Sequence, residues 1–243
     1  MKIAVIIPTY NERQNIGPLI DKILSLGIKN LSIIVVDDNS PDGTGRLVDR
    51  IAEKKNKVMA IHRPRKLGLG SAYKAGFQEA LRLSNQVLIT MDADFSHSPD
   101  VIPRMLTKIK NFDVVIGSRY VEGGKIHGFN VWRHILSGGA QALVKSILGI
   151  CVRDSTSGFR AYKAEVLKKI RYKDIKSEGY SFLIEVIFLS QQKSFKFVEV
   201  PIVYRLRARG KSKLSQWEIY KAVLTVLRLC FSFNFIAKIK LSK

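Results

Sequence analysis

The chain has 243 residues, 46% of them hydrophobic, so it can bury a core of ordinary size and is expected to form one main domain. Its 41 Lys and Arg outweigh 20 Asp and Glu by a formal +21, mostly within residues 160–243, which favours a polyanionic partner such as nucleic acid, an anionic membrane or a phosphorylated substrate. Two cysteines, Cys151 and Cys230, lie outside any Cys-x-x-Cys pair, which indicates a reducing compartment and excludes a zinc site.

Short apolar runs rich in β-branched residues alternate with helical patterns along the first half of the chain. The runs lie at residues 3–7, 33–36, 58–61, 87–91 and 114–116. The helical patterns lie at residues 16–26, 46–54, 71–83 and 100–110. Ser98 followed by Pro99 gives the last helix a cap and a first-turn proline. This alternation predicts an α/β fold with a mainly parallel sheet and helices on both faces.

The second half is less regular. We expect helices at residues 131–148 and 179–191, a strand at 195–203 and a long terminal helix at 217–236. The N-terminal apolar run ends at Pro8 without a small-residue cleavage site, so it is interpreted as a first strand and not as a signal peptide. The most apolar later stretch, 222–237, contains Arg228 and is shorter than the roughly 20 residues of a membrane span. The predicted organisation is a domain at 1–214 and a C-terminal helical segment at 215–243.

Polar residues follow the predicted strands, at the edge where parallel sheets bind ligands. Asp92 and Asp94 follow the fourth strand, and two carboxylates so placed can share a cation such as Mg²⁺, which prefers carboxylate and phosphate oxygens. A turn followed by a helix cap is the alternative. Asp37 and Asp38 follow the second strand and either accept hydrogen bonds from a base and ribose or open an Asx turn. Residues 63–70 form a basic, glycine-bearing loop before a helix, where phosphates could bind.

Seven strings of residues occur in order between residues 6 and 214. They are IPTYNE, VVDDNSPDGT, RKLGLGSAYKAGF, DADFSHSP, GSRYVEGG, DSTSGFRAY and RARGKSKL. With these strings the chain resembles the catalytic subunits of dolichol-phosphate mannosyltransferases, inverting enzymes of glycosyltransferase family 2. The resemblance implies a GT-A fold, GDP-mannose as donor, dolichyl (polyprenyl) phosphate as acceptor, and Mg²⁺ or Mn²⁺ as cofactor.

The resemblance also assigns residues to the donor side. The nucleotide and substrate pocket would be lined by Pro8, Tyr10, Glu12, Asp38 and Ala93. Asp92 and Asp94 would hold the cation against the diphosphate. Ser96 stands where some relatives have a third metal-side ligand such as Gln, and a serine hydroxyl or a water is expected in that place.

Basic and hydroxyl residues complete the predicted site. By resemblance, Arg119, Arg207 and Lys213 would face the phosphates and the sugar, although a solvated basic face is the alternative for such residues. Arg133 and Ser137 would serve the acceptor phosphate. The residues expected to carry catalysis are Asp94, Arg119, Arg133 and Ser137.

The acceptor chemistry agrees with the sequence. A sugar hydroxyl needs a general base, whereas a phosphate monoester, with a second pKa of about 6, is largely dianionic at neutral pH. The chain has neither the Glu-Asp pair of hydroxyl-using relatives nor the Gln-x-x-Arg-Trp string of processive synthases. A donor such as UDP-glucose remains an alternative. Nucleic-acid binding is disfavoured because no known module or aromatic-studded basic stripe occurs. A nucleotidyltransferase would carry a glycine-rich loop where this chain has PTYNERQN.

The predicted terminal helix has one narrow polar stripe on an otherwise apolar circumference. The stripe consists of Glu218, Lys221, Thr225, Arg228 and Ser232. Such a helix either packs on the core of its own domain or lies at a membrane interface or on a partner. Because the acceptor is a membrane lipid, we expect peripheral contact with the cytoplasmic face of a membrane. A membrane partner subunit is possible, since relatives carry spanning helices or use such a partner.

Overall fold

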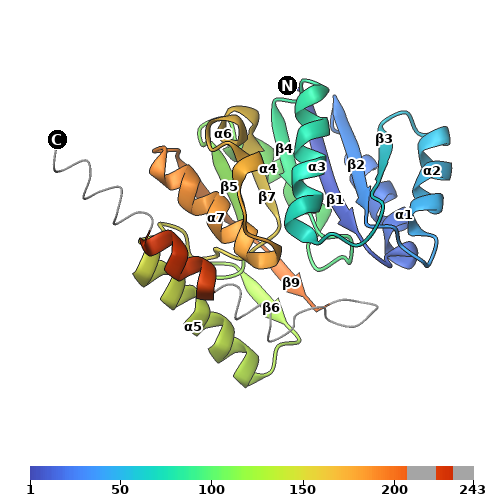
Figure 1. Ribbon diagram of the computed structural model, residues 1–243. Coiled ribbons are helices and arrows are strands. Elements are labelled where there is room, and N and C mark those ends of the chain that lie inside the picture. Colours follow the sequence, from blue (N-terminus) through green and yellow to red (C-terminus); the bar gives the residue numbers. More distant parts are fainter. Residues whose placement is uncertain (207–222, 232–243) are drawn as a thin grey trace.

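Seven strands form one sheet in the order β3-β2-β1-β4-β7-β5-β8 in the computed structural model, which describes residues 1–206 and 223–231 (Figure 1). These strands are β1 (Ile3–Thr9), β2 (Leu31–Asp37), β3 (Val58–His62), β4 (Val87–Thr90), β5 (Val114–Ser118), β7 (Arg160–Lys163) and β8 (Phe197–Pro201). β7 runs antiparallel to both neighbours, and all other adjacent pairs are parallel. β6 (Lys125–His127) and β9 (Val203–Arg205) form a separate parallel pair. β1, β2, β4 and β5 therefore end at the same edge.

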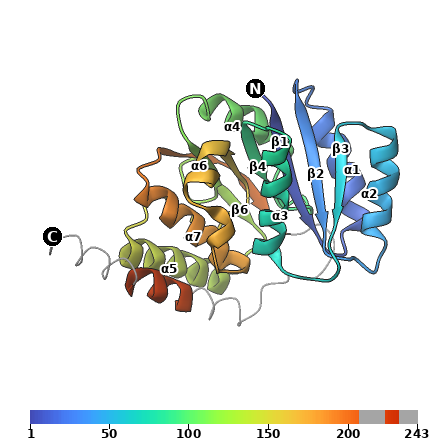
Figure 2. The ribbon, with the colours of Figure 1, turned by 45° about the horizontal axis from the view of Figure 1, so that its top comes forward.

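Helices cover both faces of the sheet (Figures 1 and 2). α1 (Arg13–Leu24), α2 (Thr44–Lys54) and α4 (Ile102–Lys108) share one apolar core with the sheet. α3 (Leu69–Arg82), α6 (Ala164–Lys169) and α7 (Gly179–Gln192) share the core on the other face. α3 lies so close to β1 that a β-carbon at Gly76 would come within 2.3 Å of Ile6 Cγ2, so only glycine allows this approach. Short 3₁₀ turns occur at Pro99–Val101 and Tyr172–Asp174.

The predicted strands and helices of the first half are confirmed, with end shifts of a few residues. Ser98 caps the turn before α4 by accepting a hydrogen bond from the Asp100 N–H at 3.4 Å. In place of the strand expected at 195–203 there are two strands, β8 and β9. The chain passes from the large sheet to the small one at Ile202, between them. β7, α6 and the β6–β9 pair were not predicted.

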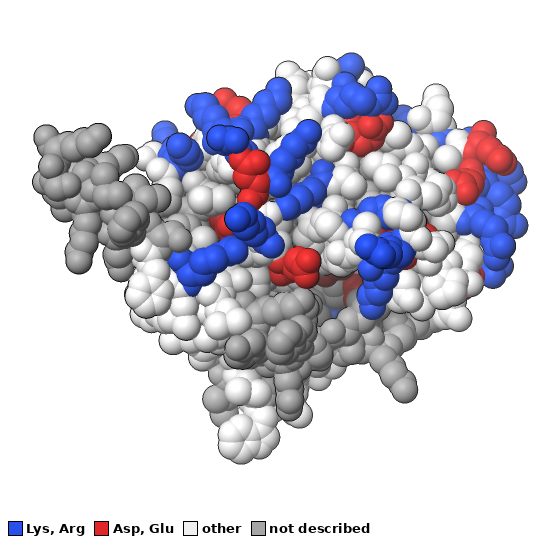
Figure 3. Space-filling view, viewed as in Figure 1, with Lys and Arg blue, Asp and Glu red and all other residues white. Residues whose placement is uncertain are grey.

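α5 (Val131–Leu148) stands apart from the sheet and contributes mainly its C-terminal end, Val144 and Leu148, to the core. Residues 223–231 are helical and run beside α5 in both views (Figures 1 and 2). The described residues visible at the lower edge of Figure 3 are mostly neither acidic nor basic. No helix in the described ranges is long and apolar enough to cross a membrane.

Candidate active site

A cavity of about 490 Å³, the central cleft, lies at the edge where β1, β2, β4 and β5 end. Its walls also include the start of α3, the start of α7 and β9. Of the predicted site residues it gathers Pro8, Tyr10, Glu12, Asp38, Asp92, Ala93 and Arg119. Lining residues that were not predicted include Lys66, His97, Thr156, Glu178, Tyr180 and Tyr204. The strand ends thus bring the predicted side chains together, although the first of them, Pro8, and the last, Arg119, are 111 positions apart in the sequence.

Asp38 fixes the basic loop that borders the central cleft. Its Oδ2 accepts hydrogen bonds from the backbone N–H groups of Leu67 and Gly68 at 3.0 and 3.1 Å, and Oδ1 pairs with the buried Arg63 guanidinium. Arg63 thus turns inward, away from any phosphate. Lys66 of the same loop lies over the Tyr10 ring, 4.5 Å from its centroid, and borders the cleft.

Asp92 and Asp94 follow β4 directly, as predicted. Asp94 is almost fully buried, and its Oδ1 accepts a hydrogen bond from the Ser96 N–H at 3.0 Å. The Asp92 side chain is 35% exposed and borders the cleft. Ser96 Oγ is buried without a hydrogen-bond partner in the described part of the chain. An unpaired hydroxyl beside two carboxylates fits a hard cation that takes oxygen ligands.

That cation would need further ligands from a substrate. No group of three or more His, Cys, Asp or Glu side chains suited to a metal occurs within residues 1–206 and 223–231. His97 Nδ1 lies 3.9 Å from Asp92 Oδ2, and burial lowers the pKa of the imidazole although Asp92 and Asp94 act to raise it. Mg²⁺ sites built with substrate phosphates commonly use only one or two carboxylates.

Arg119 follows β5 and is held by a carboxylate that the sequence analysis did not select. Its Nε and Nη2 donate to the two oxygens of the fully buried Asp154 at 2.8 and 2.7 Å, and Nη2 also donates to Thr156 Oγ1 at 2.9 Å. Burial opposes the charge of Arg119, but Asp154 outweighs it and raises the pKa of the guanidinium. Arg119 therefore borders the cleft as one half of a permanent ion pair.

The loop from Asp154 to Gly158 forms the floor beneath Asp92. A β-carbon at Gly158 would lie 3.3 Å from Asp92 Oδ1, so a larger residue would crowd the acidic pair. Arg160, which is fully buried, donates to the carbonyl oxygens of Ser155 and Ser157 at 2.7 and 2.6 Å and fixes the loop. The string DSTSGFRAY contains this whole arrangement.

α5 connects the predicted acceptor residues to this loop. Ser137 Oγ and the Tyr120 hydroxyl are 2.7 Å apart, and Gln141 contacts Ser155 and Thr156. Arg133 lies in the first turn of α5. Arg207 and Lys213 lie outside the described residues.

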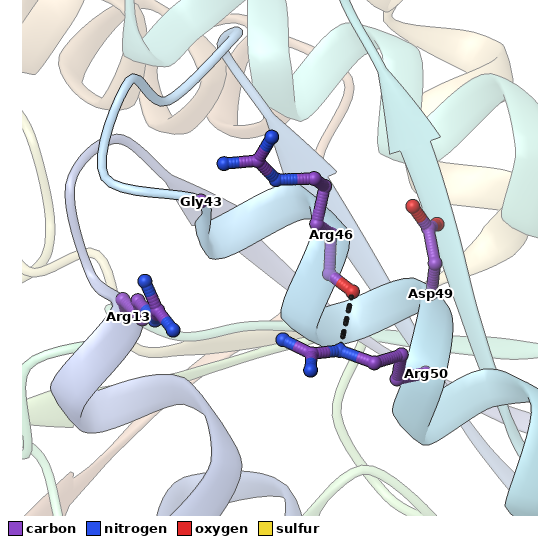
Figure 4. A pocket seen from close by; sticks show the side chains of 5 residues that line it. All are labelled: Arg13, Gly43, Arg46, Asp49 and Arg50. Atoms are coloured by element: carbon purple, nitrogen blue, oxygen red, sulfur yellow. Dashed lines mark hydrogen bonds between the residues drawn. The ribbon is translucent and has the colours of Figure 1, made fainter.

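A second hollow of about 450 Å³ lies at the N-terminal ends of α1 and α2 and shares no lining residue with the central cleft. Figure 4 shows its arginines, Arg13, Arg46 and Arg50. Arg13 begins α1 and Arg46 lies in the first turn of α2, and neither first turn holds an acidic residue. Cations at these positive helix ends are electrostatically unfavourable.

The sequence of this chain is similar to those of known glycosyltransferases. The model of glycosyl transferase family 2 matches residues 4–171. A polyprenol monophosphomannose synthase of Mycolicibacterium smegmatis is 43% identical over 91% of this chain and 84% of its own length. An undecaprenyl-phosphate mannosyltransferase of Micrococcus luteus is 40% identical over 94% of this chain and 93% of its own. A dolichol-phosphate mannosyltransferase of Pyrococcus furiosus is 40% identical over 94% of this chain and 64% of its own.

Solved structures confirm the predicted GT-A fold. Glucosyl-3-phosphoglycerate synthase from Mycobacterium tuberculosis in complex with Mg²⁺ and UDP superposes with a TM-score of 0.68. The alignment covers 94% of this chain and 79% of that one, at 20% identity. The same enzyme with Mn²⁺, UDP and glucosyl-3-phosphoglycerate gives a TM-score of 0.66 at 19% identity, over 94% and 80% of the two chains. The family resemblance seen in the seven strings is likewise confirmed by the three relatives.

Proposed function

The chain belongs to glycosyl transferase family 2, and we propose that it transfers mannose from GDP-mannose to the phosphate of a polyprenol such as dolichol, with inversion at the anomeric carbon. The observation that carries this proposal is the 40–43% identity to three enzymes whose names join mannose to a polyprenol, over at least 91% of this chain. The product is a polyprenyl-phosphate mannose for use in glycan assembly.

Asp92 and Asp94, with the Ser96 hydroxyl or a water beside them, would hold Mg²⁺ or Mn²⁺ against the donor diphosphate. The unpaired Ser96 Oγ and the two adjacent carboxylates support this assignment. When bound, the cation would stabilise the charge that develops on the departing diphosphate. Pro8, Tyr10, Glu12, Asp38 and Ala93 line the same cleft. They are proposed to receive the base, the ribose and the rest of the donor.

In the transfer step, an acceptor phosphate oxygen forms a bond to the anomeric carbon while the bond from that carbon to the diphosphate oxygen breaks. No proton has to leave the nucleophile, because the acceptor is already largely dianionic at neutral pH. The task of the chain is therefore to orient two anionic groups and offset their repulsion. Arg119, held by Asp154, supplies fixed positive charge at the cleft. Arg207 and Lys213 are proposed to add to it.

We assign the acceptor phosphate to the N-terminal half of α5. Ser137 is joined to Tyr120, the residue after Arg119, so this helix borders the same site. Arg133 lies one turn earlier on the helix and is proposed to bind the phosphate directly. The acceptor lipid would then run along α5, where Val131, Trp132 and Leu136 are exposed.

We propose peripheral binding to the cytoplasmic face of a membrane. The exposed apolar residues of α5 and of residues 223–231 support the membrane contact. In the second helix, Leu224, Leu227 and Phe231 are exposed, whereas Val226 and Leu229 are buried. This helix runs beside α5 (Figures 1 and 2), and exposed apolar residues on two neighbouring helices suit a membrane surface. Because the hydrocarbon chain of the proposed acceptor lies in a bilayer, the active site has to come close to the membrane surface to reach the acceptor phosphate.

The membrane role is tested by flotation of the full-length protein with liposomes. Leu224→Lys/Leu227→Lys adds positive charge, so attraction by charge alone would strengthen binding to anionic liposomes, whereas insertion of the apolar face predicts weaker binding. Lys108→Gln/Lys110→Gln, on the far side at the end of α4, serves as a control that lowers the positive charge. Unchanged or stronger flotation of the leucine variant would refute the membrane role of this face.

The enzymatic proposal is tested by incubating the protein with Mg²⁺, polyprenyl phosphate and either GDP-[¹⁴C]mannose or UDP-[¹⁴C]glucose. We expect radioactivity in the organic phase with GDP-mannose only, and none when the acceptor is the dephosphorylated polyprenol. Transfer from UDP-glucose alone would replace the donor assignment, and transfer to the free alcohol would refute the phosphate as nucleophile.

A further inference from the structure

Of four buried polar side-chain atoms without a hydrogen-bond partner in the described ranges, three belong to residues near Asp92 or Asp94. Within the described part of the chain, the buried side-chain atoms that lack a partner are Tyr73 Oη, Ser96 Oγ, His97 Nδ1 and Ser181 Oγ. Tyr73 lies on α3, and His97 lies in the loop after β4. Buried polar groups in native proteins are nearly always paired, so a local group of exceptions needs a physical reason.

Tyr73 and His97 both lie near the Asp92 carboxylate. His97 Nδ1 is 3.9 Å from Asp92 Oδ2. A β-carbon built on Gly158 would lie 3.2 Å from Tyr73 Oη and 3.3 Å from Asp92 Oδ1, so the hydroxyl and this oxygen border the same small space. His97 and Tyr73 are therefore the buried potential donors near the two oxygens of Asp92.

Both potential donors are carried by rings that the core holds in place. The His97 ring stacks on Phe159 with centroids 5.3 Å apart and interplanar angle 19°. The Tyr73 ring stacks on Phe77 and Phe182 with centroids 6.1 and 6.2 Å away. Neither ring can turn its polar atom to solvent, because both side chains are buried.

A phenylalanine would fill either space without leaving a polar atom unpaired. Burying an unpaired donor is unfavourable, so the hydroxyl and the imidazole are more easily explained by a state in which they are bonded. A carboxylate offers only acceptors, which match the tyrosine O–H and the Nδ1–H tautomer of histidine. Asp92 is the carboxylate that both atoms lie near.

We propose that Tyr73 and His97 are positioning residues that donate hydrogen bonds to the two oxygens of Asp92 when this carboxylate takes up a divalent cation. The inference rests on the proposed function, in which Asp92 and Asp94 hold that cation. A distance of 3.9 Å exceeds a direct hydrogen bond, so the proposal requires the Asp92 carboxylate to move closer to His97 when it takes up the cation. Hydrogen bonds of this kind fix a ligand's orientation, and their loss typically weakens metal binding by about 10- to 100-fold.

The experiment measures Mn²⁺ affinity of the full-length protein by titration calorimetry, with and without GDP, so that no turnover is needed. Tyr73→Phe removes only the hydroxyl, and His97→Phe keeps the stack on Phe159. His97→Asn restores an N–H donor near the Nδ1 position. We expect the two phenylalanine variants to bind Mn²⁺ about tenfold more weakly, the asparagine variant to recover part of that loss, and Tyr73→Phe to unfold at no lower urea concentration than wild type.

Tyr162→Phe is the matched control, because Tyr162 is also buried but its hydroxyl accepts a hydrogen bond from Arg160 Nη1 at 3.4 Å. It should keep wild-type Mn²⁺ affinity. Asp94→Asn tests the metal site itself. If Asp94→Asn loses Mn²⁺ while Tyr73→Phe and His97→Phe bind it like wild type, the positioning inference is wrong and the metal site stands. If Asp94→Asn also binds like wild type, the proposed metal site fails.

Discussion

Replacing Asp154 by alanine is expected to destabilise the protein by about 3–5 kcal/mol, because it leaves the Arg119 charge without its partner. The Asp154 side chain is 0% exposed and that of Arg119 11%, so solvent screens the pair little. Asp154 also accepts hydrogen bonds from the backbone N–H groups of Arg119 and Ser157 at 3.0 and 3.1 Å. The substitution would leave both N–H groups without this acceptor. Arg119 retains Thr156 Oγ1 and the Tyr204 ring, which places the loss near the lower end, at about 3 kcal/mol.

Urea unfolding at pH 7 measures this loss. The double variant Asp154→Ala/Arg119→Met removes the stranded charge as well, so it should be more stable than Asp154→Ala alone by about 1–2 kcal/mol. A loss below about 1 kcal/mol for Asp154→Ala, or a double variant less stable than the single one, would refute the view that this ion pair holds the loop under Asp92.

The same pair has a defined pH dependence. Burial alone would raise the pKa of Asp154, but Arg119 outweighs it and holds that pKa below its ordinary value. The stability that the pair contributes is therefore fully present above the unfolded pKa of about 3.9 and is lost as the pH falls towards the lower, folded pKa. The difference between wild type and Asp154→Ala should stay constant from pH 5 to 8 and shrink below about pH 4.

Three further predictions concern the acidic pair, Arg133 on α5 and the second hollow. Asp94→Ala and Asp92→Ala should each lower transfer by about a thousandfold or more with unchanged circular dichroism, and excess EDTA should do the same to wild type; full activity in any of these would refute the metal assignment. Arg133→Lys should raise the KM for polyprenyl phosphate about tenfold and leave that for GDP-mannose unchanged, because lysine does not replace a bidentate arginine; the reverse pattern would move Arg133 to the donor side. Arg46→Glu should stabilise the protein by about 0.5–1 kcal/mol in urea unfolding, because it places an anion at the start of α2, one turn before Arg50; Arg46→Gln should gain less, and a loss would contradict the electrostatic reasoning.

The strand ends of the central cleft could be predicted because their signals are local. A buried parallel strand is a continuous apolar run, and its last residue marks where the polar side chains begin, as at Thr90 before Asp92. Asp38 was found by the same rule, and Arg119 by the family resemblance. Their partners were not, because Arg63 and Asp154 are 25 and 35 residues away in the sequence. No periodicity relates two such positions, and only the sheet order brings them together.

β7 was not predicted because its sequence is unusual for a strand in the middle of a sheet. Its four residues, Arg-Ala-Tyr-Lys, begin with a cation, yet the strand lies between β4 and β5 in the middle of the sheet. The cation is tolerated because carbonyl oxygens of Ser155, Ser157 and Leu183 accept its N–H groups. The loop under Asp92 thus supplies the acceptors that let Arg160 be buried, and Arg160 in turn fixes that loop. This mutual dependence couples the middle of the sheet to the acidic pair.

The C-terminal helix buries a polar residue together with apolar ones. Of the predicted polar stripe, residues 223–231 contain Thr225, which is buried beside Val226 and Leu229, and Arg228, whose side chain is 42% exposed. Arg228 Nη2 lies 2.6 Å from Glu185 Oε2 on α7 and also donates to Ser177 Oγ at 2.8 Å. The ion pair to α7 holds the helix in an orientation that leaves Leu224 and Leu227 exposed. The bilayer that carries the proposed acceptor would give these leucines an apolar environment.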